Sequence, residues 1–214
     1  MSFEQKGQYR WVVCALLFFA TTVNYIDRQI LALIKEFLDA ELGWSNATFG
    51  WVNGAFQLSY AVGLLLFGWF VDRFGTKIGY ATSIVLWSVA AMSHALVGSV
   101  NGFFAARVFL GVSEGGNFPA AIKAVALWFP KKERAFATAL FNAGTNVGAI
   151  IAPAMIPAIA LTFGWRWAFI LAGLAGFVWL FFWFPMYDVP EKRKGLTRAE
   201  FDLIHSDRDE QGVG

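Results

Sequence analysis

Four ionisable residues interrupt two otherwise apolar stretches of the chain. Asp27 and Arg28 stand side by side in a run that starts at Trp11, and Arg107 and Glu114 lie in a later run. A charged side chain in the middle of a membrane costs about 2.5–3.5 kcal/mol on insertion scales, so such residues usually face a bundle interior or a watery cavity. These four residues are therefore the strongest functional signal in the sequence.

Two carboxyl groups beside two guanidinium groups suit the coupled binding of a proton and an anion. Desolvation favours the neutral acid and a nearby arginine favours the carboxylate, so Asp27 and Glu114 are predicted to exchange protons. An arginine that pairs either with a carboxylate or with an anionic substrate would link protonation to binding, as a symporter requires. The alternative is a set of ion pairs that only holds helices together, although buried pairs are poor evidence of stability.

Helical spacing places these groups relative to one another. Arg107, Gly111 and Glu114 follow an i, i+4, i+7 pattern and share one helix face. At ~1.5 Å rise per residue, Glu114 lies about 10 Å deeper than Arg107. Asp27 and Arg107 are both expected in the outer half of the membrane, where they could pair, and Lys123 is expected to extend toward the lipid headgroups.

The composition requires a membrane environment for these residues. The 214-residue chain is 57% hydrophobic and 15% charged, against about 25% charged residues in ordinary soluble domains. Long blocks without Asp, Glu, Lys or Arg match the thickness of a bilayer's hydrocarbon core. The sequence therefore predicts an all-α integral membrane fold with six spans, at about 11–34, 49–71, 78–97, 102–124, 135–158 and 166–187.

The predicted organisation is a transmembrane part over residues 1–187 and a polar cytoplasmic tail over residues 188–214. Most loop and tail Lys and Arg residues fall on one side of the six spans, and only Lys35 and Arg166 fall on the other. The positive-inside rule then places both termini in the cytoplasm. Thr197 and Glu200 fit a capping box and predict a short helix in the tail.

Several other functions are disfavoured by the composition. Cys14 is the only cysteine, which excludes a disulfide within the chain and a cysteine-based metal site. The net charge of +2 gives no indication of nucleic-acid binding. No metal or cofactor is predicted, and a proton gradient is the expected energy source.

The segment after the second predicted span reads GWFVDRFGTKIG. It resembles the G-x-x-x-D-R-x-G-R-K signature between spans two and three of the major facilitator superfamily, with Thr76 in place of the usual basic residue. The resemblance implies a cytoplasmic gate formed by Gly68, Asp72, Arg73, Gly75, Lys77 and Arg134. Gly68 is expected to let helices approach and Gly75 to make a tight turn, while Asp72 is expected to cap a helix N-terminus or to pair with Arg134.

Five further segments, NYIDR, ARVFLGVSEGGNFPA, WFPKKERAFA, NAGTNVGAIIAP and GWRWAF, resemble the anion:cation symporter family within that superfamily, particularly its hexuronate and galactonate transporters. The resemblance implies proton-coupled uptake of sugar-acid anions by alternating access, across a bacterial inner membrane. Asp27 and Glu114 would then carry protons, and Arg28 and Arg107 would link the proton to the substrate. It also implies substrate contacts at Tyr25 and Tyr60 and a polar contact from span five, supplied by Thr145 or Asn146, although Thr145 departs from the glutamine of some relatives.

The residues themselves agree with such contacts. Gln57 lies three residues before Tyr60 on span two, and both side chains suit the hydroxyl groups of a polyol. On span five, Asn142, Thr145 and Asn146 follow a 3–4 spacing and form one polar face. Aromatic packing and, at Gly144 and Gly148 on another face, close helix packing are the alternative roles for these segments.

Three competing functions are open to a membrane protein of this kind. The segment GVSEG satisfies the G-x-S-x-G pattern of serine hydrolases, but that elbow needs a strand-to-helix turn, and here it lies in a predicted membrane helix. The protein is therefore not expected to be an enzyme. A passive anion channel would also line its pore with charges, and a non-transporting binding or assembly partner would share the fold.

The length matches one half of the resembling family. Facilitator transporters consist of two six-helix halves with the substrate bound between them. The expected partner is a C-terminal six-helix half, either in the same gene product or in a separate chain. Pairing of two copies of this chain is the alternative.

Overall fold

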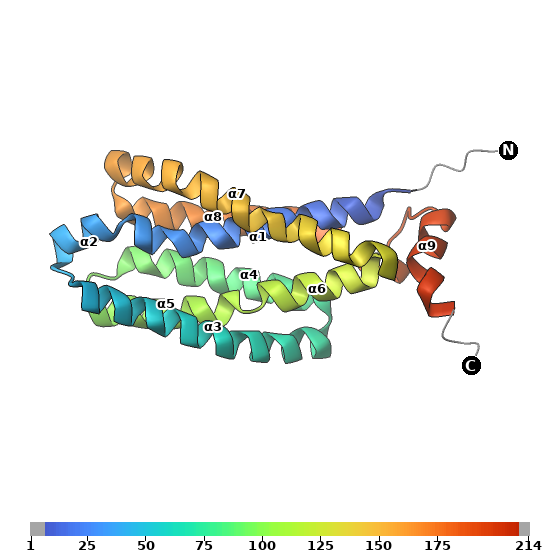
Figure 1. Ribbon diagram of the computed structural model, residues 1–214, viewed down its shortest axis with the longest axis horizontal. Helices are drawn as coiled ribbons and strands as arrows, with labels where there is room; N and C mark the ends of the chain where they lie inside the picture. The colour runs from blue at the N-terminus through green and yellow to red at the C-terminus, as the bar shows by residue number, and fades with distance from the viewer. Residues whose placement is uncertain (1–6, 210–214) are drawn as a thin grey trace.

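The structure, a computed structural model, describes residues 7–209 as a bundle of helices. In chain order these are α1 (Tyr9–Leu33), α2 (Lys35–Leu42), α3 (Asn46–Phe74), α4 (Thr76–Ser93), the 3-10 turn η1 (His94–Leu96), α5 (Val100–Glu114), α6 (Asn117–Trp128), α7 (Lys131–Phe163), α8 (Trp165–Met186), the 3-10 turn η2 (Pro190–Lys192) and α9 (Arg198–Asp209). Figure 1 shows the long helices side by side, with α2 at one end of the bundle and α9 at the other. The predicted all-α class is confirmed for these residues, and residues 1–6 and 210–214 of the two predicted parts lie outside them.

Helices α1, α3, α7 and α8 are each long and apolar enough to cross a membrane, judged by length and composition. Helix α4 and the α5–α6 pair lie alongside them in the same bundle (Figure 1). The six predicted spans correspond in order to α1, α3, α4, the α5–α6 pair, α7 and α8.

The fourth predicted span differs from the expected single helix over 102–124. The structure ends α5 at Glu114 and begins α6 at Asn117, with Gly115 and Gly116 between them. A side chain supports each side of this break, since the Ser83 hydroxyl donates to the Ser113 carbonyl at 2.6 Å and the Tyr80 hydroxyl donates to the Asn117 amide oxygen at 2.5 Å. The Ser83 bond gives the Ser113 carbonyl at the break a partner, and the Tyr80 bond holds the Asn117 side chain at the start of α6.

Two glycines make the sharpest turns between long helices. Gly75 joins α3 to α4 at φ 84°, and Gly164 joins α7 to α8 at φ 92°. Only glycine adopts this region without a steric cost from Cβ. The tight turn predicted at Gly75 is confirmed.

Helix α7 packs closely on α1 through two glycines. A Cβ at Gly144 would lie 2.5 Å from the carbonyl oxygen of Phe18, and one at Gly148 would lie 2.9 Å from the carbonyl oxygen of Thr22. Association of helices in lipid depends on such van der Waals contact, because lipid tails are as apolar as the side chains. The close-packing role proposed for these glycines is therefore confirmed.

Helix α3 packs on α5 in the same way. A Cβ at Gly111 would lie 2.6 Å from the carbonyl oxygen of Phe56, and one at Gly63 would overlap the carbonyl oxygen of Val112. Gly68 was also expected to let helices approach, but no atom lies within 4 Å of its ideal Cβ position. That expectation is wrong for the described residues, because Gly68 faces away from the other helices of the bundle.

Helix α9 confirms the short helix predicted in the tail, and it docks on the end of the bundle. The Glu200 carboxylate accepts a bond from the backbone N–H of Arg10 at 3.0 Å, and the Arg10 Nε donates to Glu133 at 2.8 Å. Ile204 is 3% exposed and joins the core of the bundle. The Thr197 hydroxyl accepts from the Glu200 N–H at 3.3 Å, which is half of the predicted capping box.

Replacing Gly144 by alanine is expected to lower the free energy of unfolding by about 1–3 kcal/mol, because the added methyl overlaps the backbone of α1. The matched control is Gly54→Ala, since no atom lies within 4 Å of the Cβ position at Gly54. Alanine there should stabilise the helix by about 0.5–1 kcal/mol. Denaturant titrations in detergent micelles measure both effects, and equal stability of the two variants would contradict the close packing of α7 on α1.

Candidate functional site

An ion pair between α1 and α5 forms the centre of the site. The Arg28 Nε donates to the Glu114 Oε2 at 2.7 Å. The Glu114 side chain is fully buried and that of Arg28 is 24% exposed. The pair therefore joins two helices in the interior of the bundle, with the guanidinium group on its more open side.

Asp27 and Arg107 complete the cluster without direct hydrogen bonds. Each is 1% exposed. Within the described part of the chain, neither carboxylate oxygen of Asp27 has a hydrogen-bond partner, and neither do Nε and Nη2 of Arg107. The expected pairing of Asp27 with Arg107 is therefore not made as a hydrogen bond, because the α1 side chain that reaches a partner on α5 is Arg28. Asp27 still lies within electrostatic range of Glu114, Arg107 and Arg28.

The cluster holds two basic and two acidic groups in a region shielded from water. When all four are ionised the formal charges cancel, and when one acid is protonated the cluster carries one positive charge. In a shielded interior, where charges interact more strongly than in water, that change alters the affinity for an anion. The arrangement can therefore bind a proton and an anion together at one place.

Two aromatic rings of α3 lie against the arginines. The Arg28 Cζ is 4.2 Å from the ring centroid of Tyr60 and 5.6 Å from that of Phe56. The Arg107 Cζ is also 5.6 Å from the Phe56 centroid. The two rings stack on each other, with centroids 6.0 Å apart and planes at 14°. Tyr60 was predicted as a site residue, whereas Phe56 was missed.

The predicted polar residues lie on α1, which carries part of this cluster, and on α3 and α7, which pack on α5 and α1, and together they are called the open polar face. Gln57, Asn142 and Asn146 are exposed, and Tyr25 and Thr145 are half-buried. Helix α7, which carries Asn142 and Asn146, packs on α1, and α3, which carries Gln57, packs on α5. The charged pair thus lies between two helices with exposed amide groups. The Thr145 hydroxyl is already used within its own helix, since it donates to the Asn142 carbonyl at 2.8 Å.

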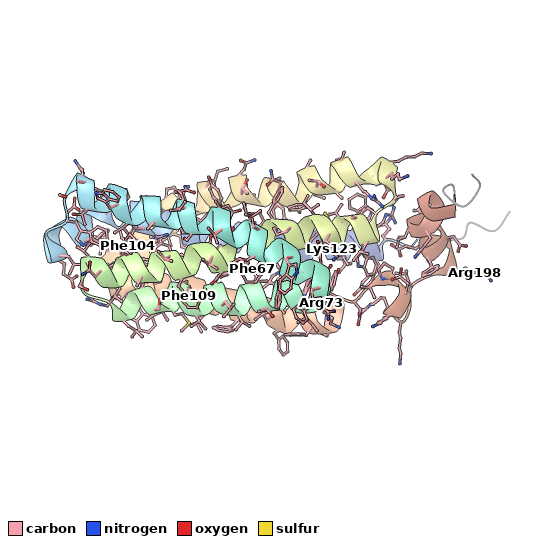
Figure 2. All side chains as sticks on the ribbon, turned by 90° about the horizontal axis from the view of Figure 1, so that it is seen from below. Phe67, Arg73, Phe104, Phe109, Lys123 and Arg198 are labelled. Carbon is pink, nitrogen blue, oxygen red and sulfur yellow. The ribbon has the colours of Figure 1, made fainter. Side chains whose placement is uncertain are left out.

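The predicted gate residues gather at the α9 end of the bundle. Asp72 pairs with Lys123, at 2.7 Å between Oδ1 and Nζ, and Lys123 also donates to the Val71 carbonyl at 3.1 Å. Figure 2 labels Lys123 on α6 and Arg73 at the end of α3. Arg73 is exposed, with its Cζ 5.9 Å from the ring of Phe74.

The expected pairing of Asp72 with Arg134 or with a helix N-terminus is therefore wrong. Asp72 pairs with Lys123, whose amine α6 brings to the end of α3. The extension of Lys123 toward the lipid headgroups stays a prediction. Arg134 instead donates to the carbonyl groups of Phe129 and Ala126, at 2.9 and 3.0 Å. It satisfies carbonyl groups at the end of α6 that have no helical partner.

Lys77 of the predicted gate joins the start of α4 to the segment after α8. Its Nζ donates to the Asp188 Oδ2 at 3.0 Å. Partial burial would raise the pKa of Asp188, but hydrogen bonds from Lys77 and from the Val189 N–H outweigh it and hold that pKa below its usual value. The charged form of Asp188 is therefore favoured by folding.

Two other buried polar residues near the cluster were not predicted as site residues. Asn24 is 3% exposed and lies one turn before Arg28 on α1. His94 is fully buried, with its Nδ1 2.8 Å from the Ala90 carbonyl and its ring stacked on Phe169 at a centroid distance of 4.7 Å. Helical spacing from Arg28 could have indicated Asn24, but nothing in the sequence distinguishes His94 from a surface histidine at a helix end.

No group of three or more His, Cys, Asp or Glu side chains that could hold a metal occurs among the described residues. Ser113 of the GVSEG segment lies inside α5, and its hydroxyl donates to the Phe109 carbonyl at 2.7 Å. The strand-to-helix elbow of a hydrolase is absent at this segment.

The comparisons with known proteins agree on one family. Residues 17–208 match the model of the Major Facilitator Superfamily. The chain is 36% identical over 202 residues to the hexuronate transporter of Escherichia coli strain K12, covering 94% of this chain and 47% of that protein. It is 31% identical over 209 residues to the galacturonate transporter of Dickeya chrysanthemi, covering 98% of this chain and 60% of that protein. The chain thus spans about half the length of the curated relatives it matches.

Solved structures agree on the fold. A bacterial homologue of the human lysosomal transporter Spinster, in an inward-facing and occupied conformation, matches with a TM-score of 0.76 at 22% identity, over 86% of this chain and 46% of that one. The xylose transporter XylE from E. coli, in a partially occluded inward-open conformation, matches with a TM-score of 0.77 at 15% identity, over 95% of this chain and 56% of that one. At these identities the likeness establishes the fold alone.

Glu114→Gln is expected to lower the free energy of unfolding by an amount near the lower end of about 3–5 kcal/mol, because it leaves the Arg28 guanidinium without its counter-charge. Asp27→Asn should cost less than Glu114→Gln, because the carboxylate loses no hydrogen bond and only its attraction to the arginines over a longer distance is lost. Denaturant titration in detergent micelles compares the two variants. A larger loss for Asp27→Asn would contradict the assignment of the ion pair.

Asp188→Asn is expected to cost less than about 1 kcal/mol of stability at pH 7, as for other partly exposed pairs. Because the pKa of Asp188 is lower in the folded protein, its contribution is present above the unfolded value and is lost as the pH falls through the folded value. The difference between the variant and the native chain should therefore shrink as the pH falls below about 4. Unfolding titrations at pH 7 and pH 3 measure it, and a difference that grows on acidification would refute the assignment.

Proposed function

The chain belongs to the major facilitator superfamily, and we propose that it forms one half of a proton-coupled symporter of small organic anions, most specifically sugar acids such as hexuronates or galactonate. The observation that carries the proposal is the buried cluster of Asp27, Arg28, Arg107 and Glu114 beside an open polar face. The relatives and the fold are those of transporters and not of enzymes.

The charges of the cluster support coupling of one proton to one monoanion. Two guanidinium groups and two carboxylates leave no net charge to attract an anion, whereas protonation of one carboxyl group leaves one positive charge. Entry of a monoanion then restores neutrality, which a water-poor interior favours strongly. A sugar acid with one carboxylate would therefore enter with one proton, and the step would move no net charge.

Asp27 is the better candidate for the transported proton. Its carboxylate accepts no hydrogen bond from the described residues, so protonation breaks none. Glu114 accepts the Arg28 Nε at 2.7 Å, and passage of the same single proton from Asp27 to Glu114 would free Arg28 for the substrate carboxylate. In this mechanism Arg28 exchanges one carboxylate partner for another, and Arg107 supplies the second positive charge beside Asp27.

The substrate class is supported by the relatives' names and by the side chains that border the cluster. The matched relatives are named as transporters of hexuronate and galacturonate. A sugar acid carries hydroxyl groups as well as a carboxylate, and exposed amides of Gln57, Asn142 and Asn146 provide donors and acceptors for them. Tyr60, whose ring lies 4.2 Å from the Arg28 Cζ, supplies a hydroxyl group near that arginine, and Tyr25 supplies another from α1.

A second six-helix half is proposed as the partner that closes the other side of the substrate site. Helix α3 exposes Trp51, Leu58 and Leu65, and α7 exposes Ile150 and Leu161. Facilitator transporters move two such halves about a site between them. The Asp72–Lys123 and Lys77–Asp188 pairs at the α9 end would form the cytoplasmic side of that movement, with both termini in the cytoplasm.

The test is uptake of labelled glucuronate, galacturonate and galactonate into proteoliposomes, with an inward proton gradient and the membrane potential clamped. Gradient-driven uptake is expected, with little dependence on the potential because the proposed step is electroneutral. Asp27→Asn and Glu114→Gln should abolish it. Asp39→Asn is the matched control, because Asp39 pairs only with Lys35 on α2, outside the cluster.

The other outcomes separate the competing functions. Uptake that follows the anion gradient and ignores the proton gradient would support a passive anion channel and contradict symport. Sugar-acid binding by the folded chain without uptake would support a non-transporting binding partner, unless co-reconstitution with a C-terminal six-helix half from a relative restores uptake. Absence of both binding and uptake would refute the proposed substrate class.

A further inference from the structure

We infer that Phe56 is a positioning residue that holds the guanidinium groups of Arg28 and Arg107 against one aromatic ring, so that the two cations act together on an anion. The inference deepens the proposed function and rests on it for the identity of the anion. No role was assigned to Phe56 from the sequence motifs. It does not touch the anion in this mechanism but acts through the arginines.

The Phe56 ring lies at the same distance from both arginines. Both guanidinium carbons lie 5.6 Å from the Phe56 centroid, so the two cations cannot be farther apart than twice that distance. The arginines come from different helices, α1 and α5, and the ring comes from a third, α3. Phe56 is therefore the one contact common to both arginines among the cation–ring contacts of the described residues.

An aromatic ring suits this position because the two cations repel each other. The face of the ring carries partial negative charge and attracts a guanidinium group within about 6 Å, most strongly where water is excluded. Phe56 is 4% exposed. The ring can thus offset part of the repulsion without a full negative charge, which a carboxylate at this place would bring and which would compete with the anion.

The neighbouring ring extends the same surface. Tyr60 stacks on Phe56 and lies 4.2 Å from the Arg28 Cζ. When Arg28 leaves Glu114, these two rings keep its guanidinium group beside the cluster. Among the rings of residues 7–209, Arg107 contacts Phe56 alone, so its position depends on Phe56 more than that of Arg28 does.

The packing of α3 makes the position of Phe56 rigid. The Phe56 carbonyl oxygen faces Gly111 of α5, at 2.6 Å from the Cβ position that any larger residue would occupy. The backbone of Phe56 is therefore held against α5 one turn from Arg107. A leucine at position 56 would fill much of the same space but would offer no negatively charged face.

The experiment replaces Phe56 by phenylalanines with one, two and three fluorine atoms in the full chain, reconstituted in lipid nanodiscs. Fluorine withdraws charge from the ring face with little change in ring size. Galacturonate affinity, measured by calorimetry, should fall stepwise with each fluorine. The loss should reach roughly tenfold for the trifluoro ring and for Phe56→Leu. Phe56→Tyr, which keeps the partial negative charge on the face of the ring, should retain affinity.

The matched control is the same fluorine series at Phe67. This residue lies on the same helix (Figure 2), is 7% exposed, and contacts the ring of Phe70 at a centroid distance of 5.9 Å. Fluorination there should leave affinity unchanged, because packing does not depend on the charge of the ring face. Equal effects at the two positions, or no trend at Phe56, would overturn the inference.

A second measurement needs no ligand and separates this inference from the proposed function. In the chain labelled with ¹⁵N-arginine, the Nε–H signals of Arg28 and Arg107, assigned with Arg28→Lys and Arg107→Lys, should both shift in Phe56→Leu as the ring current is lost. A shift of only one signal would contradict a shared ring. A native chain that binds no galacturonate would refute the proposed substrate, while the arginine signals would still decide whether Phe56 holds both cations.

Discussion

The structure depends on the burial of four ionisable groups within a bundle that offers them little water. Glu114 is fully buried, and its bond to Arg28 joins α1 to α5. A buried charge is costly unless it is paired, so the helices that carry these groups must hold a fixed distance and rotation. The tight glycine contacts, the break between α5 and α6, and the stacked rings of Phe56 and Tyr60 on α3 all help to meet this requirement.

Small residues set the distances on which the charges depend. Gly111 brings the backbone of α5 onto α3 beside Phe56, and Gly144 and Gly148 bring α7 onto α1. Because backbones approach so closely, the side chains between them have few alternative positions. The open polar face then remains as the part of the site with freedom to adapt to a ligand.

The sequence was sufficient for the parts of this arrangement that depend on local pattern. Buried charges among apolar residues identified Asp27, Arg28, Arg107 and Glu114, and the glycine at position 75 identified the turn between α3 and α4. The pairing within the cluster could not be predicted, because adjacent residues on a helix differ in direction by about 100° and only packing decides which one reaches α5. Likewise, Lys123 is brought to Asp72 by the break after Glu114, and Phe56 is one of 23 phenylalanines, with nothing local to single it out.

The docking of α9 has a consequence for the order in which the protein assembles. The bond between Arg10 and Glu200 joins residues separated by 190 positions, and Arg10 also holds Glu133 at the start of α7. During synthesis this contact cannot form until residue 200 has left the ribosome, by which time every long helix of the bundle has been made. Contacts of such long sequence separation form late. The junction of Arg10, Glu133 and Glu200 therefore forms only after α1 to α8 have been synthesised, and it joins α9 to helices made long before it.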